Sequence, residues 1–125
     1  MSTSQWNTLK QKAKNLESRL ETKVQRYSSA AQKIDAEYLC DEENPMMANS
    51  EERELSSEIE RDLNDLADCI TSMRNCSLGS STGHQEVLIK RYDELHFDYS
   101  GEYRTISVFL YEYHYIACYS TFCFD

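Results

Sequence analysis

The chain has 125 residues, which is enough for one domain, and it contains only three glycines and one proline. Several β-hairpins would need more turn residues than that, so the composition favours long helices. The formal net charge of −9 argues against a nucleic-acid-binding protein, which normally presents a basic face.

The strongest periodic signal covers residues 4–35. Apolar or small residues recur there at steps of three and four, beginning at Trp6 and Leu9, and lysines and glutamates fill the positions between them. This pattern predicts an amphipathic helix with one dry and one wet face, and with spacing close to a heptad repeat. A helix of about 32 residues would be roughly 48 Å long, so it needs partners of similar length to bury its apolar stripe.

The next segment, residues 36–49, is acidic and contains the only proline, Pro45, so we expect a loop there. A second helix is predicted over residues 50–76, with glutamates in its first turns, where the helix dipole favours negative charge. Its apolar stripe runs from Leu55 to Met73. The carboxylates between the stripe residues, Glu58 and Asp62 among them, are interpreted as a solvent-facing surface.

Residues 77–83 are rich in glycine and serine and predict a short connection. The third helix is expected over residues 82–110. The following stretch holds seven of the fourteen aromatic residues of the chain within residues 105–125, together with several β-branched residues. Because such residues favour strand or disorder over helix, we expect residues 106–125 to form an irregular, hydrophobic, aromatic-rich tail.

The combined expectation is an all-α fold, an antiparallel three-helix bundle that occupies residues 1–105. The predicted core residues are those that share the three apolar stripes. They are Trp6, Leu9, Ala13, Leu16, Leu20, Val24 and Tyr27 in the first helix, Leu55, Ile59, Leu63, Leu66 and Ile70 in the second, and Leu88, Tyr92, Leu95, Tyr99 and Ile106 in the third.

Charge is unevenly distributed along the chain. Residues 1–35 carry a net charge of +4, residues 36–76 carry −9, and residues 77–125 carry −4. A basic first helix beside an acidic second helix would help to fix their antiparallel pairing. Solvated faces are the alternative interpretation, since exposed ion pairs contribute little to stability.

No motif predicts catalysis, and we expect neither a cofactor nor a metal site. The sequence lacks a glycine-rich phosphate loop, a His-Glu-x-x-His motif and a Cys-x-x-Cys motif. The five cysteines have no zinc-like spacing, and no signal peptide opens the chain, so free thiols in a reducing compartment are expected. His114, Cys118 and Cys123 could form a metal site only with irregular spacing and too few ligands.

The residues from Trp6 to Ser28 resemble the opening of the 28 kDa Golgi SNARE family, which are Qb-SNAREs. That opening has a Trp, a Leu-basic step (Leu9-Lys10) and a Leu-Glu step (Leu16-Glu17), and an aromatic-Ser pair follows. Residues 58–66 are similar to the second helix of the family, and residues 91–105 are similar to its third helix.

The resemblance implies an N-terminal regulatory domain that serves vesicle transport between the endoplasmic reticulum and the Golgi and within the Golgi. Its implied partners are other SNAREs, tethers or regulators, at the cytosolic face of the Golgi membrane. The similarity ends near Thr105, so we expect the fusion helix of the family to be missing. Two alternatives remain open: a helical adaptor or self-associating coiled-coil protein, and a protein anchored in the membrane through residues 106–124.

Overall fold

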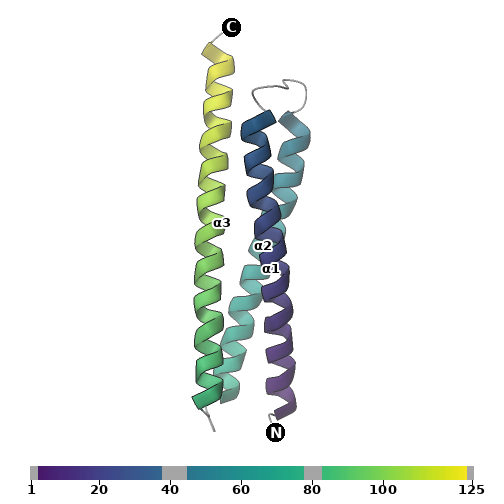
Figure 1. Ribbon diagram of the computed structural model, residues 1–125, viewed down its shortest axis with the longest axis vertical. Coiled ribbons are helices and arrows are strands. Elements are labelled where there is room, and N and C mark those ends of the chain that lie inside the picture. The colour runs from purple at the N-terminus through teal and green to yellow at the C-terminus, as the bar shows by residue number, and fades with distance from the viewer. Residues whose placement is uncertain (1–2, 38–44, 78–82, 124–125) are drawn as a thin grey trace.

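The computed structural model of the chain consists of three long helices packed side by side. It describes the backbone of residues 3–37, 45–77 and 83–123, and the side chains of residues 4–33, 51–77 and 83–113. The helices are α1 (Thr3–Glu37), α2 (Pro45–Ser77) and α3 (Gly83–Cys123), and the described residues contain no strand. Figure 1 shows that α2 runs opposite to α1 and α3. The predicted all-α, antiparallel three-helix bundle is therefore confirmed.

The core is a single seam to which all three helices contribute one face. The buried residues follow the three-and-four spacing in α1 and α2, because that spacing places side chains on one side of a helix. In α3 the same spacing is completed by half-buried residues between Tyr92 and Leu110. The apolar residues buried in the seam are Trp6, Ala13, Leu16, Leu20, Val24, Tyr27 and Ala31 in α1, Leu55, Ile59, Leu63, Leu66, Cys69, Ile70 and Met73 in α2, and Ile89, Tyr92 and Leu110 in α3.

Five of the predicted core residues are half-buried and pack against the edge of this seam. They are Leu9, Leu88, Leu95, Tyr99 and Ile106. Four of the five belong to α3, and the fifth, Leu9, belongs to α1. Ile89 and Leu110, which the predicted core omitted, are the buried apolar residues of α3 together with Tyr92.

The helix α2 begins earlier than the sequence predicted. Residues 36–49 were expected to be a loop, but α2 starts at Pro45. Proline suits the first position of a helix, because the missing N–H would have no partner there and the fixed φ angle already matches the helix. The residue that indicated a loop is thus the one that opens the helix.

The expectation of an irregular tail is wrong for the part of the tail that the structure describes. α3 continues as a helix to Cys123, beyond the predicted end at residue 110, and Figure 1 shows it projecting past the ends of α1 and α2. The seam spacing continues through Tyr103, Ile106 and Leu110, and Leu110 is only 3% exposed. As far as Leu110, tertiary packing on this stripe outweighs the weak strand preference of the aromatic and β-branched residues.

The packing of α3 also moves the end of the bundle past residue 105. Leu110 belongs to the buried cluster, and the Tyr27 hydroxyl and Ser107 Oγ are hydrogen-bonded at 3.2 Å. A chain cut after residue 105 would lose the buried Leu110 side chain and the hydrogen bond to Tyr27 of α1. As for a membrane anchor, none of the helices, over their described residues, has a stretch apolar and long enough to cross a bilayer.

Candidate functional site

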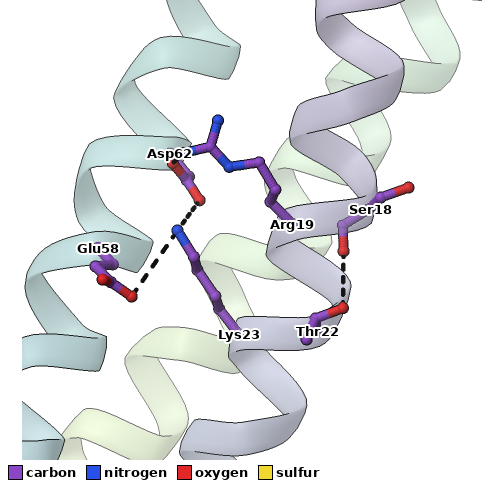
Figure 2. A network of polar contacts seen from close by, with 6 residues as sticks. All are labelled: Ser18, Arg19, Thr22, Lys23, Glu58 and Asp62. Carbon is purple, nitrogen blue, oxygen red and sulfur yellow. Dashed lines mark hydrogen bonds and ion pairs between the residues drawn. The ribbon is translucent and has the colours of Figure 1, made fainter.

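A cluster of charged side chains joins α1 to α2 near the middle of the bundle (Figure 2). The Lys23 ammonium donates a hydrogen bond of 2.8 Å to Asp62 Oδ2 and lies 3.9 Å from Glu58 Oε2. The Arg19 guanidinium lies 3.3 Å from the other carboxylate oxygen of Asp62. The Asp62 side chain is fully buried, whereas that of Arg19 is half exposed. The cluster therefore places a buried anion between two cations of the neighbouring helix.

This arrangement corrects the interpretation of Asp62 as part of a solvent-facing surface. Asp62 comes immediately before the core residue Leu63, at a position that faces α1. A buried carboxylate is costly unless it is paired, and the basic residues of α1 supply the pairing. Between the two interpretations of the uneven charge, these contacts favour interhelical pairing at this site.

Two further ion pairs tie α3 to its neighbours. Arg74 of α2 contacts Asp93 of α3 at 2.5 Å, and Arg91 of α3 lies 3.3 Å from Glu17 of α1. Three of these four side chains are more than half exposed, so each pair contributes little free energy. These ion pairs instead favour one rotation of α3 about its axis relative to α1 and α2.

An open groove of about 740 Å³ runs along the surface between α2 and α3. Seven of its eleven lining residues are polar or charged, and the others are Leu63, Val108 and two tyrosines. The α2 wall consists of Glu60, Leu63 and Asn64; the α3 wall consists of His96, Ser100, Tyr103, Arg104, Ser107, Val108, Tyr111 and Glu112. The sequence did not predict this groove, because its walls come from α2 and α3 and the apolar stripes do not define how these two helices are set against each other.

Tyr103 organises the floor of the groove. Its hydroxyl donates a hydrogen bond of 2.7 Å to Glu60 Oε1, and Ser56 Oγ lies 2.5 Å from the same hydroxyl oxygen. Since the Tyr103 proton is used toward Glu60, the Ser56 hydroxyl donates to Tyr103. The Tyr103 ring packs against Tyr27 with 5.6 Å between ring centroids. The ring is thereby fixed in place by contacts with both α1 and α2.

Burial is the main cause that raises the pKa of the Tyr103 phenol, and the neighbouring Glu60 raises it further. The phenol therefore stays neutral and keeps donating to Glu60 at physiological pH. His96 sits on the same wall, and its Nε2 lies 3.1 Å from the carbonyl oxygen of Leu63. Val108 and Tyr111, both half exposed or more, give the end of the groove that lies beyond residue 105 an apolar surface.

The cysteine and histidine side chains, which could act as nucleophiles, bases or metal ligands, do not assemble into a reactive site among the described side chains. The Cys69 thiol is buried and donates to the carbonyl oxygen of Leu9 at 3.3 Å, and burial raises its pKa, so it is a poor nucleophile. His84 is exposed at the start of α3. No group of three potential metal ligands occurs in the part of the chain that is described. Cys40 lies outside the described residues, and so do the side chains of His114, Cys118 and Cys123.

The arrangement suits binding of a helix better than chemistry on a small molecule. The groove is open along its length, it is bordered by two helices, and its polar groups are spread along the walls. An amphipathic helix laid in such a groove could bury its apolar side on the exposed Val108 and Tyr111. No protein-family model, curated protein or solved structure matches the chain.

Proposed function

We propose that the chain is a partner-binding helical domain of the Golgi SNARE type that acts in vesicle-mediated transport and has no enzymatic activity. The proposal rests on two independent supports. The first is the resemblance of residues 6–28, 58–66 and 91–105 to the three N-terminal helices of that family. The second, which carries the mechanism, is the open groove between α2 and α3, with its apolar end and its fixed tyrosine.

The mechanism is docking of a partner helix along this groove. The partners are other SNAREs, tethers or regulators, and docking takes place at the cytosolic face of the Golgi membrane. The apolar face of the partner helix packs on Val108 and Tyr111, while Asn64 and Ser100 offer hydrogen bonds beside it. Because Tyr103 and Glu60 are already bonded to each other, the floor is pre-ordered and little conformational entropy is lost on binding.

Replacing Asn64 with arginine tests this mechanism. Asn64 is exposed on the α2 wall, so the longer charged side chain would fill the groove without disturbing the core. In a pull-down from Golgi-enriched lysate, the full chain is expected to recover Golgi SNAREs or tethers, identified by mass spectrometry. The affinity of Asn64→Arg for the recovered partner is expected to be at least about tenfold lower, a loss of at least about 1.4 kcal/mol of binding free energy, and its recovery falls accordingly.

Asn7→Arg is the matched control, because it makes the same change at an exposed asparagine of α1 that does not line the groove. It is expected to recover the same proteins as the unmodified chain. Circular dichroism of all three proteins checks that they are equally helical. Recovery of no Golgi protein would reject the trafficking role, and equal recovery by Asn64→Arg and Asn7→Arg would reject the groove as the binding surface.

A further inference from the structure

A second stripe of residues runs along α3 on the side that faces away from the core. Four of the five large apolar residues that the bundle leaves exposed lie on it: Val87, Phe97, Val108 and Tyr111. The fifth, Phe109, points to a different side, toward Tyr113. Val87 is 69% exposed and Phe97 is 78% exposed, so these side chains make little contact within the bundle. Such an alignment of exposed apolar side chains marks an interaction surface.

The stripe has a heptad period. Positions 87, 94, 101 and 108 recur every seven residues, and so do positions 90, 97, 104 and 111, three residues further on. They carry Val87, Lys90, Glu94, Phe97, Gly101, Arg104, Val108 and Tyr111, all of them on the surface of α3. Two sets of positions with this offset form the contact line of a coiled coil when they are mostly apolar. Here four of the eight are apolar or aromatic, one is glycine and three are charged. Over the 24 residue steps from Val87 to Tyr111, this line extends about 36 Å.

We infer that this stripe pairs with the same stripe of a second copy of the chain, with the two α3 helices antiparallel. In an antiparallel coiled coil, positions of the first set face positions of the second. The heptad then places Glu94 opposite the partner's Arg104, and Phe97 opposite the partner's Gly101. Val87 comes opposite the partner's Tyr111, and Lys90 opposite the partner's Val108. Each contact occurs twice, because the pairing has two-fold symmetry.

Charge complementarity favours a second copy of the chain as the partner, and it favours antiparallel over parallel pairing of the two α3 helices. Neither Glu94 nor Arg104 has an ion pair with another described residue of its own chain. Antiparallel pairing gives both of them partners of opposite charge. Parallel pairing in the same register would instead place Glu94, Lys90 and Arg104 each against its own copy, and juxtaposed like charges disfavour a complex. An antiparallel shift by one heptad would set Glu94 against an aromatic ring.

Gly101 supplies the space that the pairing needs at its centre. A Cβ atom at this position would meet nothing within 4 Å in the bundle, so the glycine is not required by packing inside the chain. Glycine within a helix lowers stability by about 1 kcal/mol relative to alanine. Opposite the partner's Phe97, the missing side chain opens a recess for the ring. The contact with the partner's Phe97 gives a reason for glycine at position 101, which packing within the single chain does not require.

The dimer is expected to be weak, since three of the eight stripe positions are charged. Reversing the charge of Glu94 or Arg104 distinguishes this dimer from other kinds of association. Sedimentation equilibrium of the full chain is expected to show a monomer–dimer mixture in the micromolar range. Glu94→Arg or Arg104→Glu alone places like charges together twice and is expected to weaken association by at least about tenfold. An equimolar mixture of these two variants is expected to associate again, and so is the double variant Glu94→Arg/Arg104→Glu.

Gly101→Leu provides an independent check, because it is expected to raise helix stability while it abolishes the dimer. The inference is overturned if the unmodified chain remains a monomer throughout the concentration range. It is also overturned if the single reversals leave association unchanged, or if the mixture and the double variant do not restore it. Of the substituted residues, Glu94 and Gly101 do not line the groove, whereas Arg104 does. Glu94→Arg and Gly101→Leu therefore test the dimer separately from the groove that Asn64→Arg tests.

Discussion

Leu20→Ala is expected to lower the free energy of unfolding by about 2–5 kcal/mol, measured by urea denaturation followed by circular dichroism. The Leu20 side chain is fully buried in the seam at the middle of α1, where residues of α2 and α3 surround it. Truncation removes apolar contacts and leaves a cavity that a bundle of three continuous helices cannot readily close. Since a domain of this size has a stability of about 5–15 kcal/mol, the loss is a large fraction of the total.

Two matched substitutions calibrate this effect by burial. Leu95→Ala makes the same change at a half-buried position of α3 and is expected to cost less. Val87→Ala, at a position that is 69% exposed, is expected to change stability by less than about 0.5 kcal/mol at concentrations where the chain is monomeric. If the three substitutions had equal effects, the assignment of the seam would be wrong.

Lys23→Met is expected to destabilise the bundle by about 3–5 kcal/mol, because it leaves the fully buried Asp62 carboxylate without its closest cation. Methionine preserves most of the apolar stem of lysine, so lost packing contributes little. Arg19 remains 3.3 Å from Asp62, but it is half exposed and is shared with solvent. Thermal and urea unfolding of the variant measure the loss.

The double variant Lys23→Met/Asp62→Leu is expected to recover much of that stability, since it removes the buried charge together with its partner. Lys33→Met is the control, because Lys33 is an exposed lysine of the same helix and makes none of the ion pairs seen among the described residues. A loss in Lys23→Met no larger than that in Lys33→Met would show that the charge cluster does not hold α1 and α2 together.

The sequence predicted the bundle most accurately where apolar periodicity is uninterrupted. α1 has no glycine or proline, and its observed bounds, Thr3–Glu37, differ by two residues or fewer from the predicted range 4–35. The buried residues of α1 among those described follow the predicted stripe from Trp6 to Tyr27, apart from the half-buried Leu9. Periodicity decided these positions because a helix of this length must bury one continuous face.

Residues whose local preference conflicts with their packing were predicted poorly. Pro45 indicated a loop but occupies the first position of α2. The aromatic residues after Thr105 indicated strand or disorder, yet Leu110 continues the seam of α3. Asp62 was predicted to be exposed, because an unpaired carboxylate is more stable in water than in a protein core. Its burial depends on Arg19 and Lys23, which lie some forty residues away in the sequence.

The candidate groove could not be predicted for a related reason. Its walls come from α2 and α3, and its shape depends on how far each helix extends and on the angular setting of one helix against the other. The exposed stripe of α3 could be predicted from the sequence, because Val87, Phe97, Val108 and Tyr111 all fall on two sets of positions that repeat every seven residues. Because Arg104, Val108 and Tyr111 belong to both surfaces, pairing of two copies would cover one end of the groove.

The groove exists only if α3 remains folded beyond residue 105, since Ser107, Val108, Tyr111 and Glu112 form one end of it. Amide hydrogen exchange over residues 106–112 tests this most directly, in the Glu94→Arg variant so that pairing of two copies cannot supply the protection. These amides are expected to exchange at least about a hundredfold more slowly than those of an unstructured peptide. Exchange at the unstructured rate would mean that the bundle ends near residue 105 and that the groove does not form.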